Sequence, residues 1–318
     1  MTRYLIGLAF MVLAAGCASK PTGLPQQLPD RATRVLHGYI YYFDGAGGGT
    51  ARKNWAEGVR DGMLLGGYPG AGEMFTWETG EGLMADQDAS VKFKRSKALE
   101  AAAKIKQHVS EYPGRPLDML GFSAGTAVAI FALEDLPETI QVNEVVLLGA
   151  SISEDYDLTK ALRRVKGHVY VYTSTHDRML GFLMPFSGTA DRKFDDLGAG
   201  ITGFTLPKGA TAETRRLYAE KIVTIPWTAK LEKDSDYGGH FDNVKMEFIR
   251  DHVAPLFTGK PVRGLPNGRK PSGTRTGDVD RTPGDRRWTR WQESLRSHIP
   301  NRLRTVDGKA FGVGSECR

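Results

Sequence analysis

The chain of 318 residues carries 43 Lys and Arg against 37 Asp and Glu, which gives a net charge of +6 and a pI near 9.2. The basic excess is confined to one end, because residues 258–318 hold 14 Lys and Arg against 6 Asp and Glu, and the rest of the chain has a net charge of −2. This distribution excludes a protein that is basic over its whole surface, and the length permits one large domain or two small ones.

The N-terminus has the layout of an export signal. Residues 5–13 (LIGLAFMVL) form an apolar run that is too short to span a bilayer, and small residues follow it. The sequence LAAGC, which ends at Cys17, resembles the bacterial lipobox, although Ala14 stands where that pattern prefers Leu. The resemblance implies a lipoprotein signal peptide of residues 1–16, lipidation of Cys17 and, since Ala18 is not Asp, the outer membrane. An ordinary signal peptide that precedes a cysteine by chance is the alternative.

Two segments flank the central body of the chain. Residues 17–33 are predicted to be a tether between the lipid and the folded domain, and with Cys17 lipidated no intramolecular disulfide is expected. Residues 258–318 are rich in Pro, Gly and Arg and are predicted to be a disordered, basic tail. Trp288 and Trp291 lie there among arginines, a combination that suits anionic lipid or a cell-wall polymer, but a solvated tail without a partner is favoured and nucleic acid is not expected.

Residues 34–257 alternate strand-like and helix-like segments. Strands are predicted at residues 35–43, 73–78, 117–120, 142–148, 168–173 and 222–227, and helices at residues 54–65, 91–109, 124–133, 158–165 and 243–253. Strands that alternate with helices favour a mostly parallel sheet covered on both faces. The prediction is therefore one three-layer α/β domain with a minimal sheet of about six strands.

The sequence GFSAG, Gly121 to Gly125, lies at the end of one of these strands and at the start of a helix. This context predicts the strained strand–turn–helix that presents a serine nucleophile, here Ser123. The two glycines are expected because the backbone of neighbouring segments must pass close to this turn. A glycine-rich turn with an inert serine is the alternative.

A serine nucleophile needs a base and an orienting carboxylate. Asp177 directly follows the strand at residues 168–173, and His240 lies in the loop YGGHFD before the last predicted helix. Their order after Ser123, acid and then histidine, is the order expected for such sites. Asp155 and Asp157, which follow the preceding strand, remain open as alternative acids.

The tetrahedral intermediate of acyl transfer needs two backbone N–H donors. Ala124, which follows Ser123, is one candidate. The loop DGAGGG at residues 44–49 resembles the His-Gly oxyanion loop of many hydrolases, with Asp44 in place of His, and implies Ala46 as the second donor, with Gly45 and Gly47 as structural glycines. A phosphate-cradling loop is the weaker alternative, because no Walker lysine pattern accompanies it.

Residues 35–257 thus resemble an α/β-hydrolase of the esterase/lipase superfamily. The resemblance implies hydrolysis of a lipid or small acyl ester through an acyl-enzyme, without metal or organic cofactor. The usual first strands of that family are missing, and the link between residues 148 and 168 is too short for a large cap domain. Residues 180–217 are predicted to be either a partial lid or a surface loop with its own small core. A catalytically silent envelope lipoprotein, which would use the scaffold and the tail for binding, is the alternative function.

Overall fold

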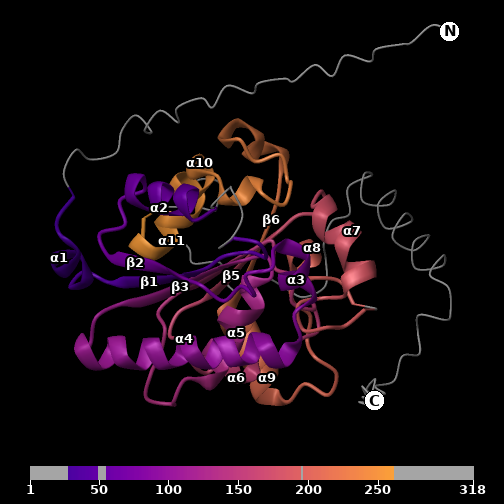
Figure 1. The fold of residues 1–318 in the computed structure, drawn as a ribbon, viewed down its shortest axis with the longest axis horizontal. Helices are drawn as coiled ribbons and strands as arrows, with labels where there is room; N and C mark the ends of the chain where they lie inside the picture. Colours follow the sequence, from indigo (N-terminus) through magenta and orange to yellow (C-terminus); the bar gives the residue numbers. More distant parts are fainter. Residues whose placement is uncertain (1–27, 49–54, 195, 261–318) are drawn as a thin grey trace, which may run out of the picture.

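The computed structural model describes residues 28–48, 55–194 and 196–260. These residues build one six-stranded sheet in the order β2-β1-β3-β4-β5-β6, in which every pairing is parallel (Figure 1). The strands are β1 (Tyr39–Phe43), β2 (Ala71–Phe75), β3 (Leu117–Phe122), β4 (Val145–Leu148), β5 (Val169–Thr173) and β6 (Ile222–Pro226). The predicted α/β class with a parallel sheet of six strands is confirmed.

Apart from Asp118 in β3, the central strands are apolar or aromatic without alternation because both faces of the sheet are covered. Every residue of β1, β3, β4 and β5 is buried. In β1, alternate side chains enter different cores: Tyr39, Tyr41 and Phe43 join one hydrophobic cluster, while Ile40 and Tyr42 join another. This is the two-sided burial expected of parallel sheets.

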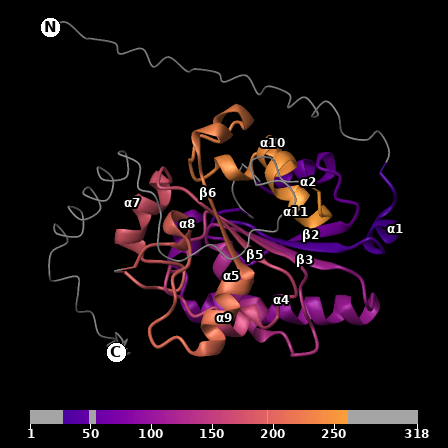
Figure 2. The ribbon, with the colours of Figure 1, turned by 180° about the vertical axis from the view of Figure 1, so that it is seen from behind.

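Helices form a layer on each face of the sheet (Figures 1 and 2). One layer consists of α4 (Val91–Glu111), α5 (Gly125–Asp135), α6 (Thr159–Leu162) and α9 (Ala212–Lys221). The other consists of α2 (Trp55–Leu65), α10 (Met246–Phe248), the π-helical turn η3 (Ile249–Val253) and α11 (Ala254–Thr258). The short helix α1 (Arg31–Val35) packs beside β2.

Three helices and two 3-10 turns lie in the connections that follow the carboxyl ends of the strands. They are α3 (Leu83–Asp88), α7 (Arg178–Ser187), α8 (Ala199–Thr202), η1 (Ala229–Asp234) and η2 (Asp242–Val244). Ligand sites of open parallel sheets form at this edge, so these segments surround the region where a site is expected.

The insertion predicted at residues 180–217 contains most of α7, all of α8 and the first part of α9. Leu180, Met184 and Ile201 form a small buried cluster within it, and Phe204 packs into the main core. This arrangement favours the prediction of a loop with its own small core. Phe182, Leu183 and Phe186, which would contribute to a lid, lie in α7, but the structure does not describe their side chains.

Several predicted features also fall outside the described residues: the signal peptide, Cys17, most of the tether at residues 17–33, and residues 261–318 of the tail. Within the described part, no helix is both long and apolar enough to cross a membrane.

Candidate active site

Ser123 lies in the sharp turn that joins β3 to α5. Its φ is 50°, in the left-handed region that side-chain-bearing residues rarely adopt. The Ser123 N–H donates to the Leu148 carbonyl at the end of β4 (2.9 Å), and the Thr126 N–H donates to the Ser123 carbonyl (3.1 Å). The turn is thus held from both sides in a strained conformation, which is a feature that clusters at functional sites.

The glycines on either side of Ser123 have no room for a side chain. A Cβ on Gly121 would lie 3.0 Å from the Thr126 Cα, and a Cβ on Gly125 would lie 2.2 Å from the Asp44 carbonyl oxygen. The first turn of α5 therefore packs directly against the end of β1. The sequence GFSAG encodes this close approach.

Ser123, His240 and Asp177 form one chain of hydrogen bonds, although 117 positions separate Ser123 from His240. His240 Nε2 lies 2.9 Å from Ser123 Oγ, and His240 Nδ1 lies 2.6 Å from Asp177 Oδ2. All three side chains are buried, with exposed fractions of 9%, 6% and 2%. The second Asp177 oxygen accepts the Leu180 N–H (2.9 Å), so Asp177 also caps α7 and cannot rotate freely.

The alternative acids lie elsewhere. Asp155 pairs with Lys193, whose hydrogen bond lowers the pKa of the Asp155 carboxyl. Asp157 is exposed, and its Oδ1 accepts the Thr159 N–H (2.9 Å). The structure brings Asp177, and neither of these two, into contact with His240.

Two carboxylates shape the loop that carries His240. Asp236 Oδ1 accepts the Gly238 N–H (2.8 Å), and Asp242 Oδ2 accepts the Gly239 N–H (2.9 Å). Ser174 Oγ donates to the Gly238 carbonyl (2.7 Å) and fixes the loop to the end of β5. Burial raises the pKa of Asp236 to about 6. The sequence predicted His240 in the loop YGGHFD, but it gave no role in shaping that loop to Asp236, Asp242 or Ser174.

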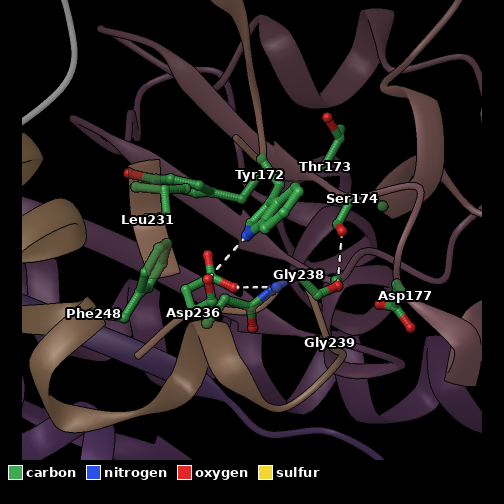
Figure 3. A pocket seen from close by; sticks show the side chains of 13 residues that line it. Tyr172, Thr173, Ser174, Asp177, Leu231, Asp236, Gly238, Gly239 and Phe248 are labelled. Atoms are coloured by element: carbon green, nitrogen blue, oxygen red, sulfur yellow. Dashed lines mark hydrogen bonds between the residues drawn. The ribbon is translucent and has the colours of Figure 1, made fainter. Parts of the chain in front are cut away.

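A pocket lies beside this loop and includes Asp177 in its wall (Figure 3). In Figure 3, Gly238 lies between Asp236 and Ser174, with a hydrogen bond to each, and Phe248 lies on the side of Asp236 away from Ser174. Neither Ser123 nor His240 lines the pocket. It therefore lies behind the hydrogen-bonded chain, on the side of the acid.

An aromatic cluster packs on the histidine. The rings of Phe122 and His240 are 4.9 Å apart, and Trp55, the first residue of α2, stacks on Phe241 at 4.3 Å. These contacts join α2 to the His240 loop. The sequence predicted a helix at Trp55 but no contact with the site.

The loop after β1 lies against Ser123. A Cβ on Gly45 would be 3.1 Å from the Ser123 Cβ. Among the described residues, the backbone N–H groups of Ala46 and Ala124 donate no hydrogen bond. Asp44 is fully buried, and burial raises the pKa of its carboxyl to about 6. The loop that carries Ala46 thus lies against Ser123, and Ala124 directly follows Ser123 at the start of α5.

The described residues contain no group of three or more His, Cys, Asp or Glu side chains arranged to hold a metal ion.

Comparison with known proteins gives no family for this chain. No family model matches it, and no curated protein matches it. Among solved structures, RedJ with a PEG molecule bound in the active site is 15% identical over 64% of this chain and 95% of that chain, with a TM-score of 0.32. The agmatine ureohydrolase of Thermoplasma volcanium is 12% identical over 71% of this chain and 88% of that chain, with a TM-score of 0.27. At these TM-scores neither similarity supports a conclusion about function.

Proposed function

We propose that this protein is a serine hydrolase of the α/β-hydrolase type that cleaves a carboxylic ester. The observation that carries the proposal is the buried chain from Ser123 Oγ through His240 to Asp177, with distances of 2.9 Å and 2.6 Å. Its three members come from the carboxyl ends of β3 and β5 and from the loop after β6. A hydroxyl, an imidazole and a carboxylate in this order form the constellation that activates a serine for acyl transfer.

In the acylation step, Ser123 Oγ attacks the ester carbonyl carbon while its proton moves to His240 Nε2. Asp177 accepts the hydrogen bond from His240 Nδ1–H and stabilises the imidazolium. The carbonyl oxygen becomes an oxyanion, to which the N–H groups of Ala46 and Ala124 donate. The C–O bond to the alcohol then breaks, and the alcohol leaves with the proton from His240.

In the deacylation step, a water molecule attacks the acyl carbon and gives a proton to His240. The second tetrahedral intermediate uses the same two N–H donors. Its collapse releases the carboxylic acid and returns the proton from His240 to Ser123 Oγ, which restores the free enzyme. Every step uses side chains and backbone groups of this chain together with water.

The proposed substrate is a lipid or small acyl ester, and the proposed location is the cell envelope, where a lipid on Cys17 would hold the protein at the membrane. The location rests on the LAAGC sequence alone. Expression in a bacterium followed by membrane fractionation tests it: Cys17→Ser should move the protein to the soluble fraction. A variant that stays with the membranes would contradict the lipid anchor.

The catalytic proposal is tested with a fluorophosphonate probe and a series of p-nitrophenyl esters of increasing chain length. The wild-type protein should be labelled and should turn over at least one ester, while Ser123→Ala should lose labelling and several orders of magnitude in kcat. Ser151→Ala is the matched control, because Ser151 is also buried and lies just after β4, but its Oγ has no hydrogen-bond partner among the described residues. Labelling that survives in Ser123→Ala and disappears in Ser151→Ala would overturn the assignment.

A further inference from the structure

Two of the four backbone N–H groups of the turn at residues 45–48 donate within the loop itself. The Gly45 N–H donates to Asp44 Oδ1 (2.8 Å), and the Gly48 N–H donates to the Gly45 carbonyl (3.1 Å). The Ala46 N–H has no acceptor among the described residues. Among the described residues the Ala46 N–H is thus left without an acceptor, in a turn that lies against Ser123 through Gly45.

The remaining N–H of the turn, that of Gly47, is held by a carboxylate from another element. Asp86 of α3 is fully buried, and its Oδ2 accepts the Gly47 N–H at 2.7 Å. Its Oδ1 accepts both the backbone N–H and the hydroxyl of Thr79, each at 2.6 Å. Both oxygens are therefore occupied, and the side chain is fixed from two directions.

Gly47 is the point at which α3 rests on the turn. Its φ is 77°, which glycine adopts readily and which suits the third residue of a type II turn. A Cβ at this position would lie 3.0 Å from the Leu83 Cβ at the start of α3. Gly47 is therefore held by two hydrogen bonds, the one from the Gly48 N–H to the Gly45 carbonyl that closes the turn and the one from its own N–H to Asp86.

The opposite side of the turn is fixed independently. Tyr42 Oη donates to Asp44 Oδ1 (2.5 Å), and Trp77 Nε1 donates to the Asp44 carbonyl (2.8 Å). Trp77 is fully buried. The peptide between Asp44 and Gly45 is thus held at its N–H by Asp44 Oδ1 and at its carbonyl by Trp77, while Asp86 holds the N–H of the peptide that follows Ala46.

We propose that Asp86 is a positioning residue for catalysis, which aims the Ala46 N–H at the oxyanion of the transition state by holding the N–H of Gly47. This inference rests on the proposed serine hydrolase. An oxyanion donor acts only when it lies within about 2.7–3.1 Å of the developing charge, so small rotations of the peptide lower the rate. Loss of Asp86 removes the acceptor of Gly47 and frees the peptide that follows Ala46.

The test compares Asp86→Ala with the matched control Asp118→Ala. Asp118 is also a buried aspartate with both oxygens hydrogen-bonded, to the Glu144 N–H and the Tyr68 hydroxyl, but it lies at the opposite end of β3 from Ser123. For Asp86→Ala we expect kcat to fall about 10- to 100-fold, below the loss of about 10²–10³ for a donor removed outright, with KM changed less than about threefold. The control should keep kcat within about twofold.

A second readout separates positioning from general stability. An aryl trifluoromethyl ketone forms a reversible adduct in which the serine oxygen bonds to the carbonyl carbon, the serine proton moves to His240 and the carbonyl oxygen becomes an oxyanion. Its affinity should fall in Asp86→Ala by about the same factor as kcat. Asp86→Asn keeps only one acceptor oxygen for the N–H groups of Gly47 and Thr79, so it should recover at most part of both losses. It serves as the test variant if the alanine variant does not fold.

The outcomes distinguish this inference from the function on which it rests. If the wild-type protein is neither labelled by fluorophosphonate nor active on any ester, the proposed hydrolase function is wrong, and so is the proposed role of Asp86. An active, labelled wild-type protein whose Asp86 variants keep kcat and ketone affinity would overturn the role of Asp86 alone. A fall in melting temperature without a change in kcat would also reject it.

Discussion

At the scale of single residues, the candidate site depends on side chains that have two partners each. Asp177 binds His240 with one oxygen and caps α7 with the other. His240 contacts Asp177 and Ser123 through its two ring nitrogens. A residue fixed from two sides keeps its orientation without the entropic cost of ordering it at each turnover, and this pre-organisation is what acyl transfer requires.

The assignment of the acid gives a prediction at this scale. Asp177→Asn keeps the shape but favours the wrong tautomer of His240, so kcat should fall by a factor on the order of 10⁴. Asp155→Asn and Asp157→Asn should keep nearly all of the activity, because neither side chain reaches His240. The measurement is kcat for the three variants on one p-nitrophenyl ester, with circular dichroism to check folding. A large loss of kcat in the Asp155 or Asp157 variant, together with an unchanged kcat in the Asp177 variant, would refute the assignment of the acid.

Part of the site could be predicted from the sequence and part could not. Ser123, Asp177 and His240 follow a motif and an order along the chain, so they can be found without knowledge of contacts. Trp55 and Asp86 reach the site only through the packing of α2 and α3, and no spacing in the sequence encodes that. Asp177 and Asp155 each follow a predicted strand, so the sequence pattern alone left the choice between these two acids open.

At the scale of elements, the site depends on how closely α5 approaches β1. A Cβ on Gly125 would lie 2.2 Å from the Asp44 carbonyl oxygen and 2.4 Å from the Phe43 carbonyl oxygen. Both of these atoms belong to backbone, which cannot move aside without shifting the strand. The distance between the helix and the strand therefore sets the position of the turn after β1 relative to Ser123.

Gly125→Ala should accordingly damage both the fold and the site. We expect a loss of unfolding free energy of more than about 2 kcal/mol, which is typical of overpacking, together with a large loss of kcat. Gly114→Ala is the control: its φ is 73° but nothing lies within 4 Å of its Cβ, so it should cost only about 1–2 kcal/mol and leave kcat unchanged. Chemical denaturation measures both. Equal effects of the two substitutions would contradict the close approach.

The observed boundaries of several elements differ from the boundaries predicted from the sequence. The strand predicted at residues 35–43 begins only at Tyr39, because Asp30 caps a short helix that ends at Val35. The helix predicted at residues 243–253 is divided. Lys245 is extended (φ −68°, ψ 145°) and separates η2 from α10. The π-helical turn η3 follows α10, and after it comes Pro255, which lacks an N–H. All six strands were predicted, although β2, which contains Gly72 and Glu73, lies at Ala71–Phe75 and not at the predicted residues 73–78.

At the scale of the whole molecule, the sheet separates two hydrophobic cores and collects the site residues at one edge. Ser123 and Asp177 both follow strands at their carboxyl ends, and the turn at residues 45–48 follows β1 at the same edge. Buried carboxylates occur at both ends of the sheet. Burial raises the pKa of Asp44 to about 6 near the site and that of Asp118 to about 7 at the far end.

These raised pKa values link the stability of the whole fold to pH, and Asp118 gives a test away from the site. Its carboxyl binds a proton more tightly in the folded state than in the unfolded state, where its pKa is near 3.8. Between about pH 4 and pH 7 the folded state therefore holds more protons, and the contribution of Asp118 to the free energy of unfolding falls as the pH rises.

Asp118→Asn removes this titration while keeping an acceptor oxygen for the Glu144 N–H. Relative to the wild-type protein, the variant should therefore gain stability as the pH rises from 4 to 8, by on the order of 1–4 kcal/mol. Urea denaturation at several pH values measures the difference. Tyr68→Phe, which removes a hydrogen bond that lowers the pKa of Asp118, should extend the fall in stability to higher pH. A difference between Asp118→Asn and the wild-type protein that stays constant or shrinks across this range would show that Asp118 does not titrate in it.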